Sequence, residues 1–243
     1  LCKIPSLQND GLEILKGLAK DPMDSVRINS VASIMFHVYD QKTFISSVWP
    51  ILKPLFEDSC WRVKYSCISK IGEVDDSAQP DLQLAGKENV KKLILPYYAK
   101  LLVEEEKEEI RRLTKLTCIA TKNIRVLVGF LDPEDIISKI IPLIKNIVTN
   151  ETNYIRSALA ESLLSLAPVL QKKNTNDHIL GFFLTLLRDE CSDVRINIFK
   201  TFHELTQVLP PQTLIQSVLP VFVESAADKN WKNRIRVLQC MIN

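Results

Sequence analysis

The sequence predicts an all-α protein, a right-handed α-solenoid of about six antiparallel helical hairpins, and two observations carry this prediction. Glycine is scarce, with 6 among 243 residues, whereas about 7% is usual in globular proteins. Few tight β-turns can then form, which favours helices. A self-similar pattern also recurs at intervals of roughly 40 residues, which is typical of repeats built from two helices.

Each repeat is marked by an aliphatic residue followed by a basic one. The basic residues are spaced 37, 47, 45, 39 and 39 apart, and they are Arg27, Lys64, Arg111, Arg156, Arg195 and Arg234. Six positions before each stands an acid or an amide, namely Asp21, Asp58, Glu105, Asn150, Asp189 and Asp228. Fourteen positions before four of them stands Pro50, Pro142, Gly181 or Pro220, and Pro96 is one position off. Two fixed offsets within a variable period indicate one structural unit that repeats.

Within a repeat, an apolar helix A precedes a polar turn and an amphipathic helix B. The fourth and fifth copies show the helix B stripe at spacings of three or four: Ile155, Leu159, Leu163, Leu166 and Leu170, then Val194, Ile198, Phe202, Leu205 and Leu209. The proline in helix A removes one backbone hydrogen bond and bends the helix, which the interior of a strand could not accept. This combination predicts HEAT-type repeats.

The expected repeats follow one another in a single array over residues 1–243. They cover residues 7–40, 41–75, 88–130, 133–171, 174–209 and 211–243, the last one incomplete. Residues 75–88 (DDSAQPDLQLAGKE) are polar and include Pro80 and Gly86. We expect them to form an extended loop between repeats, which accounts for the 47-residue period.

The bulk composition argues against several classes of protein. The formal net charge is +2, which is too balanced to indicate a polyanion or an anionic membrane as partner. The apolar run from Ile136 to Val148 is broken by Lys139 and Lys145, and is too short to span a bilayer. The six cysteines lie far apart without a C-x-x-C pair, so we expect free thiols in a soluble, intracellular protein.

No stretch of the sequence matches a catalytic motif. A zinc-binding H-E-x-x-H that starts at His203 is broken by Gln207. A phosphate-binding loop ending at Gly86-Lys87 would need glycine where Asp81 stands. We therefore expect no enzymatic activity, no cofactor, no metal and no small-molecule substrate.

The recurrent acids and basic residues are interpreted as architecture. Across one turn, the carboxylate can cap helix B, while the guanidinium reaches it or the acid of the next repeat. Such a ladder would fix how repeats stack. Its predicted members are Asp21, Arg27, Asp58, Lys64, Arg111, Asn150, Arg156, Asp189, Arg195, Asp228 and Arg234.

Trp61 and Trp231 share one position in the turn, three residues before the basic residue. Its other occupants are polar, namely Asp24, Glu108, Asn153 and Ser192, so the position is expected to face solvent. An exposed tryptophan beside Arg62 or Lys232 is typical of a protein interface. The alternative is that Trp61 folds back over the neighbouring turn.

Residues 58–66 (DSCWRVKYS), the run 157–198 and residues 228–234 (DKNWKNR) resemble the scaffold subunit of protein phosphatase 2A, which is its A-type regulatory subunit. The resemblance implies a segment from the middle of a non-enzymatic HEAT-repeat scaffold, cytoplasmic and also nuclear. Its turns would hold an interchangeable B-type regulatory subunit and the metal-dependent phosphatase catalytic subunit. The implied regulatory-subunit contacts are Met23, Asp24, Trp61, Arg62, Lys107 and Glu108. The implied catalytic-subunit contacts are Trp231 and Lys232.

Two other functions stay open at this point. A HEAT-repeat transport or chromosome-organising adaptor would use the helix B surface instead of the turns. A HEAT-fold DNA glycosylase would need a basic stripe and an acid among aromatic side chains, and the even charge balance speaks against it.

Overall fold

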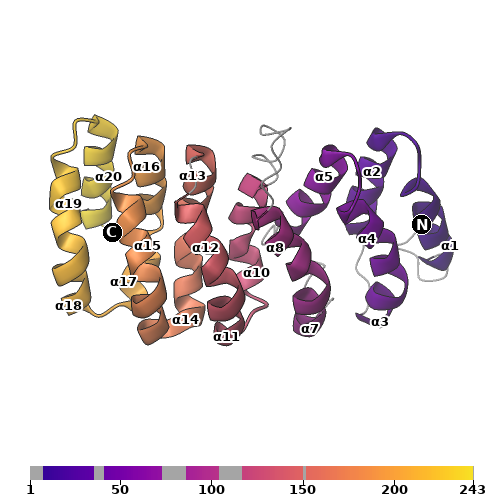
Figure 1. Ribbon diagram of the computed structural model, residues 1–243, viewed down its shortest axis with the longest axis horizontal. Coiled ribbons are helices and arrows are strands. Elements are labelled where there is room, and N and C mark those ends of the chain that lie inside the picture. Colours follow the sequence, from indigo (N-terminus) through magenta and orange to yellow (C-terminus); the bar gives the residue numbers. More distant parts are fainter. Residues whose placement is uncertain (1–7, 36–40, 73–85, 104–116, 150–151, 243) are drawn as a thin grey trace. The chain divides into compact units, whose positions relative to one another are not determined.

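The computed structural model describes residues 8–35, 41–72, 86–103, 117–149 and 152–242 (Figure 1). All regular structure in these ranges is helical, which confirms the predicted all-α class. The chain divides into two compact units, Leu1–Phe130 and Leu131–Asn243. The single array of six repeats stays a prediction, and each unit is described by itself.

The first unit is built from short helices that pair in sequence order. They are α1 (Gln8–Leu18), α2 (Asp24–Met35), α3 (Gln41–Thr43), η2 (Phe44–Val48), α4 (Trp49–Phe56), α5 (Trp61–Gly72), α7 (Lys87–Asn89), η3 (Val90–Ile94), α8 (Leu95–Val103) and α10 (Ile124–Val128). Helix α7 begins inside the predicted 75–88 loop, so that loop ends earlier than expected. Gly86 directly before it has φ 76°, a backbone conformation in which glycine is favoured.

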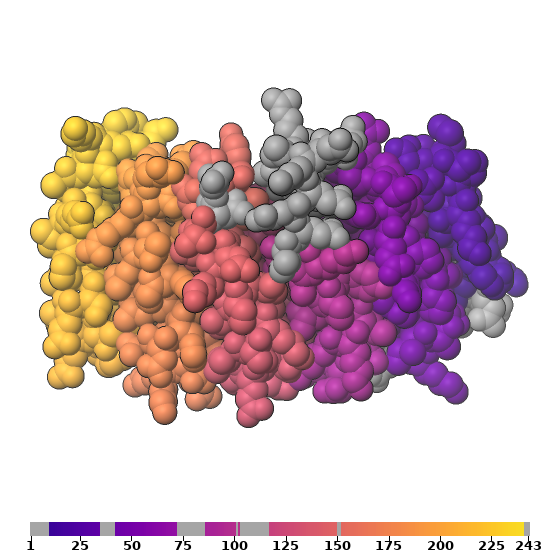
Figure 2. Space-filling model, in the orientation of Figure 1, coloured from indigo at the N-terminus to yellow at the C-terminus, as the bar shows by residue number. Residues whose placement is uncertain are grey.

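The second unit continues the same arrangement. Its helices are α11 (Pro133–Asp135), η4 (Ile136–Ile140), α12 (Ile141–Val148), α13 (Asn153–Ser162), η5 (Leu163–Leu166), α14 (Ala167–Asn174), η6 (Thr175–Ile179), α15 (Leu180–Leu187), α16 (Ser192–Lys200), α17 (Phe202–Val208), α18 (Pro211–Thr213), η7 (Leu214–Val218), α19 (Leu219–Ala226) and α20 (Trp231–Ile242). Figure 2 shows the hairpins of this unit as successive bands, with α19 and α20 in yellow.

A π-helical turn precedes the main segment of helix A in five of the described repeats. These turns are η2, η3, η4, η6 and η7. The second residue after each is Pro50, Pro96, Pro142, Gly181 or Pro220. A proline lacks the N–H group of a normal helical bond, and its ring clashes with the carbonyl four residues earlier. A wider turn just before it relieves both problems, which accounts for the π-helical turn before the four prolines, whereas η6 has the same turn before Gly181.

The residue before Gly181 has the same backbone conformation as the residue before Pro220 in the next repeat. Leu180 has φ −56° and ψ −41°, and Leu219 has φ −54° and ψ −42°. A Cβ atom on Gly181 would meet no atom within 4 Å.

We expect Gly181→Pro to stabilise the fold by about 0.5 kcal/mol, because it restricts the unfolded chain. Gly17→Pro, near the end of α1, should instead destabilise it by about 3 kcal/mol. Urea unfolding of both variants tests this, and a loss of stability in Gly181→Pro would contradict it.

The core of the second unit follows the predicted helix B stripes. Ile155, Leu159, Leu163, Leu166 and Leu170 are each at most 5% exposed. In the next repeat four of the five predicted positions are buried, and Phe202 is half-buried. Each buried leucine or isoleucine stabilises the fold by roughly 1.5–3 kcal/mol. Among the helices of the described ranges, none is long and apolar enough to cross a membrane.

A buried polar network joins three segments of the first unit. The Asn123 side-chain amide donates to the Ile68 carbonyl of α5 at 2.6 Å and to the Tyr98 hydroxyl of α8 at 3.2 Å. The Tyr98 hydroxyl in turn donates to the same carbonyl at 3.3 Å. Burial raises the pKa of Tyr98 well above its ordinary value, so the ring stays neutral. These bonds satisfy groups that would otherwise be unpaired in the core.

Candidate functional site

Four turns between helix A and helix B, among the residues that the structure describes, share one local structure. Each of the four begins with an aspartate whose carboxylate accepts the backbone N–H two residues later. The pairs are Met23 to Asp21 at 2.8 Å, Cys60 to Asp58 at 2.7 Å, Cys191 to Asp189 at 2.8 Å and Asn230 to Asp228 at 2.7 Å. The aspartate therefore closes an Asx turn. The N–H that donates to the aspartate belongs to the residue directly before helix B. The aspartate was predicted to cap helix B, and in the structure it bonds to the backbone one residue before the helix begins.

The arginines of helix B bind in two directions. Nη1 donates to the carbonyl of the aspartate in its own turn, in Arg27 to Asp21, in Arg195 to Asp189 and in Arg234 to Asp228. The rest of the guanidinium reaches the carboxylate of the following turn, from Arg27 to Asp58, from Arg156 to Asp189 and from Arg195 to Asp228.

Two of these pairs are bidentate and shielded from solvent. Arg27 Nε and Nη2 lie 2.8 and 3.1 Å from the two carboxylate oxygens of Asp58. Arg156 makes the same fork with Asp189 at 2.6 and 2.9 Å, and both side chains are less than 10% exposed. A planar fork fixes both distance and orientation. Each pair therefore sets how one turn lies against the next within its unit.

Part of the predicted ladder cannot be placed. Lys64 is half-buried on α5. Its predicted partner Glu105 lies outside the described residues. The ladder residues Arg111 and Asn150 also lie outside the described residues. So do Lys107 and Glu108, two of the predicted regulatory-subunit contacts.

Asp228 makes the stability of the second unit sensitive to acid. The Asn230 N–H, the Asn233 amide and Arg195 hold the pKa of this carboxyl below its ordinary value of 3.8. A lowered folded-state pKa gives stability that is present above the unfolded pKa and lost as pH falls through the folded pKa. We expect the Asp228→Asn variant to lose less free energy of unfolding than the wild type when the pH falls below 4. Urea unfolding across pH 6 to 2 measures this, with the exposed Asp177→Asn as control. Equal pH dependence in wild type and Asp228→Asn would contradict it.

Trp61 lies in a cluster formed by two neighbouring turns. The centroids of the Trp61 and Tyr65 rings lie 6.3 Å apart in a T-shaped arrangement, and the Arg62 guanidinium carbon lies 6.0 Å from the Trp61 ring centroid. Arg62 Nη1 is 3.7 Å from a carboxylate oxygen of Asp24 in the first turn. The Cys60 thiol donates to the same oxygen at 3.4 Å. Arg62 and the Cys60 thiol thus reach one carboxylate of α2, and the Trp61 ring lies beside Arg62 and Tyr65.

The exposure of the turn residues varies. The Arg62 side chain is 64% exposed, and Met23 is exposed as well. Trp231 is 58% exposed, whereas Trp61 is half-buried. Trp61 is therefore less open to solvent than its turn position suggested, although Arg62 beside it is open. Lys232 is also exposed.

Two residues of these turns were not predicted from the sequence. Tyr154 is 71% exposed and occupies the same repeat position as Arg62 and Lys232, which is the signal that could have identified it. Asn233, which stands at the aliphatic position of the repeat, is fully buried. Its amide donates to the Asp228 carboxylate at 2.8 Å, so it supports the last turn.

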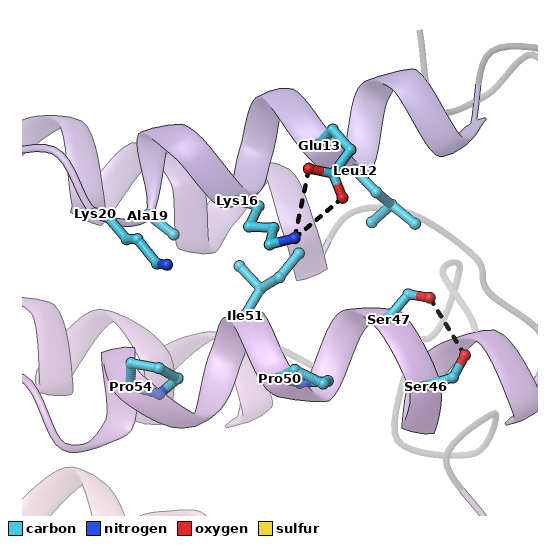
Figure 3. Close-up of a pocket in the computed structure, with 10 residues that line it drawn as sticks. All are labelled: Leu12, Glu13, Lys16, Ala19, Lys20, Ser46, Ser47, Pro50, Ile51 and Pro54. Atoms are coloured by element: carbon cyan, nitrogen blue, oxygen red, sulfur yellow. Dashed lines mark hydrogen bonds and ion pairs between the residues drawn. The ribbon is translucent and has the colours of Figure 1, made fainter.

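A groove of about 300 Å³ lies in the first unit between α1 and the η2–α4 segment (Figure 3). Lys16 at its edge donates to Glu13 at 3.2 Å, and the hydroxyls of Ser46 and Ser47 lie 3.2 Å apart. Pro50, Ile51 and Pro54 supply apolar surface from α4. Within the described ranges there is no group of His, Cys, Asp and Glu side chains that could hold a metal.

Comparison with curated proteins finds relatives among phosphatase subunits. The chain is 33% identical over 119 residues to the beta isoform of the human 65 kDa A-type regulatory subunit of serine/threonine-protein phosphatase 2A, covering 47% of this chain and 19% of the relative. It is 25% identical over 126 residues to human serine/threonine-protein phosphatase 4 regulatory subunit 4, covering 52% of this chain and 14% of the relative. The predicted resemblance is confirmed. The chain spans less than a fifth of the length of these relatives.

Solved structures with a similar arrangement of helices include designed repeat proteins. A crystal structure of computationally designed armadillo repeat proteins for modular peptide recognition matches with a TM-score of 0.58 and 14% identity, covering 95% of this chain and 98% of that one. This likeness supports the α-solenoid class. The family model described as "PIK3R4-like, middle domain" matches residues 14–243. The chain therefore belongs to the PIK3R4-like middle-domain family.

Proposed function

We propose that this chain is a non-catalytic scaffold segment that holds a regulatory subunit and the catalytic subunit of a 2A-type serine/threonine phosphatase through its intra-repeat turns. The names of the curated relatives support a phosphatase regulatory role. The first unit would bind the regulatory subunit through Met23, Asp24, Trp61 and Arg62. Trp231 and Lys232 in the second unit would bind the catalytic subunit.

The observation that carries the proposal is the cluster around Trp61. Arg62 is mostly exposed, and its guanidinium lies 3.7 Å from Asp24 and 6.0 Å from the centroid of the Trp61 ring. A partner would then meet a cation and an aromatic ring that already lie side by side, which would reduce the entropy lost on binding. Tryptophan and arginine are also the residues most often found to dominate binding energy at interfaces.

The turns suit this role because they are ordered without being buried. The Asx turn and the arginine pairs fix the backbone on which Met23, Arg62 and Trp231 stand. A scaffold of this kind needs no chemistry of its own. It raises the effective concentration of the enzyme near a recruited substrate.

Site-specific photo-crosslinking tests the proposal. A photoreactive residue in place of Arg62 should crosslink to a phosphatase subunit in cell extract. The matched control replaces Arg125, an exposed arginine on helix α10 away from the Trp61 cluster, and should give no such product. Crosslinks to phosphatase subunits from helix B positions such as Glu161, with none from Arg62, would contradict docking through the turns and favour an adaptor that uses helix B.

A further inference from the structure

The groove between α1 and the η2–α4 segment of the first unit has an apolar floor and a basic edge (Figure 3). Leu12 and Ala19 on one side and Ile51 on the other are each at most 8% exposed. Lys16 and Lys20 stand at the edge, and both are exposed. The volume of about 300 Å³ is at the lower end of the size of ligand pockets in proteins.

Aromatic rings fill the equivalent space between α4 and α8, one repeat further along the chain. The Tyr97 ring of α8 lies against Trp49 and Phe56 of α4, with centroids 6.0 and 5.5 Å apart. Its hydroxyl donates to Glu57 Oε1 at 2.9 Å. Trp49 and Phe56 are each at most 8% exposed. A ring from the second helix thus packs on two rings of the first, with a carboxylate at its polar end.

The groove has small aliphatic residues at the positions of these rings. The repeat spacing pairs each lining residue with a counterpart, namely Leu12 with Trp49, Ala19 with Phe56, Lys20 with Glu57 and Ile51 with Tyr97. The first three pairs are 37 residues apart, as the turn residues Asp21 and Asp58 are, and the last is 46 residues apart, as Pro50 and Pro96 are. Because leucine, alanine and isoleucine are smaller than tryptophan, phenylalanine and tyrosine, the groove stays open where the next repeat is packed.

Lys20 stands beside this open apolar surface without an acid. It directly precedes the aspartate of its turn, as Arg188 does in the second unit. Arg188 pairs with Glu224, which stands four residues after the recurrent proline of the next helix A, at 3.3 Å. At that position the groove has Pro54, at the same end as Lys20 (Figure 3). Among the residues that the structure describes, no carboxylate pairs with Lys20.

We propose that the groove binds a peptide segment of a partner protein, which places an aromatic side chain on the apolar floor and a carboxylate beside Lys20. The ring takes the place that the Tyr97 ring takes between α4 and α8. The carboxylate supplies to Lys20 the acid that Glu224 supplies to Arg188. An acidic aromatic segment therefore matches both the shape of the groove and the charge at its edge. The site is formed by helix A segments and does not depend on the phosphatase contacts proposed for the turns.

Selection from a random peptide library displayed on phage tests the chemistry of the occupant. Peptides enriched on the chain should combine an aromatic residue with an aspartate or a glutamate. In fluorescence polarisation with labelled copies of these peptides, replacing the aromatic residue by alanine should weaken binding at least about tenfold, because the ring buries most of the apolar area. Lys20→Glu should weaken binding about threefold or more. The matched control Lys145→Glu, which changes an exposed lysine on α12 of the second unit, should leave binding unchanged.

Filling the groove from within gives an independent test. The double variant Ile51→Tyr with Lys20→Glu introduces into the groove the residues that form the pair of Tyr97 and Glu57 in the next repeat. It should weaken peptide binding at least about tenfold, and more than Lys20→Glu alone, because the new ring occupies the space of the peptide ring. Its thermal unfolding temperature should equal or exceed that of the wild type, since the added ring fills open space.

Three outcomes would overturn the proposal. The first is a selection that enriches no peptide, or only peptides that lack the aromatic residue or the acid. The second is peptide binding that both Lys20→Glu and the double variant leave unchanged, and a loss in Arg62→Ala instead would place the peptides on the Trp61 cluster. The third is sedimentation of the chain as a dimer that the double variant dissociates, which would make a second copy the occupant.

Discussion

Arg156→Ala is expected to destabilise the second unit by about 3 kcal/mol or more, because it leaves the Asp189 carboxylate in a buried position without its cation. The Arg156 and Asp189 side chains are 8% and 7% exposed, and two hydrogen bonds join them. Arg156→Lys should recover only part of this stability, since an ammonium group cannot form the planar fork. Urea unfolding followed by circular dichroism measures both changes.

The control is Arg188, whose pair with Glu224 is longer, at 3.3 Å, and lies in solvent. Arg188→Ala should change the free energy of unfolding by less than about 1 kcal/mol. An equally small change in the free energy of unfolding in Arg156→Ala and Arg188→Ala would contradict a structural role of the ladder. Complete recovery by Arg156→Lys would show that charge alone, without the fork, holds the two turns together.

Trp61→Ala is expected to weaken binding of the regulatory subunit at least 30-fold, which corresponds to roughly 2 kcal/mol for a central aromatic residue. The ring contacts Tyr65 and lies beside the Arg62 guanidinium. Its removal therefore takes away contact area and also frees Arg62 from one of its neighbours. Surface plasmon resonance with the purified subunit measures the change, which should appear mainly as faster dissociation.

Trp61 is half-buried, so its loss must be separated from local unfolding. Trp61→Phe keeps an apolar ring in the cluster and should restore part of the affinity. Arg125→Ala, away from the Trp61 cluster, should bind as wild type does. Wild-type affinity in Trp61→Ala, with its thermal unfolding unchanged, would contradict a docking role for this turn.

The sequence predicted the helical class and the turns because both depend on local spacing. Helix B stripes at three and four residues, and an acid six residues before a base, are visible without any knowledge of the fold. In the structure, Arg27 lies close to Asp58 and Arg195 close to Asp228, the acid of the following turn in each case. The sequence could not tell that Arg27 and Arg195 each bind a backbone carbonyl of their own turn and the carboxylate of the next.

Long-range packing accounts for most of what the sequence could not predict. Asn123 bonds to a carbonyl 55 residues away, and no local pattern marks it as buried. Polar residues occupy the position of Trp61 in other repeats, yet Trp61 is half-buried. Its large ring reaches Tyr65, which a small polar side chain could not contact. Gln171 has φ 59° and ψ −177°, a conformation that favours glycine, and nothing in its neighbourhood in sequence indicates this.

The most direct test of the scaffold function is whether one chain holds both phosphatase subunits at once. Analytical ultracentrifugation of the chain with a purified catalytic subunit and a purified regulatory subunit should show a ternary complex. Trp61→Ala should release only the regulatory subunit, and Trp231→Ala only the catalytic subunit. Mutually exclusive binding of the two subunits, or a ternary complex that survives both substitutions, would contradict a scaffold that works through these turns.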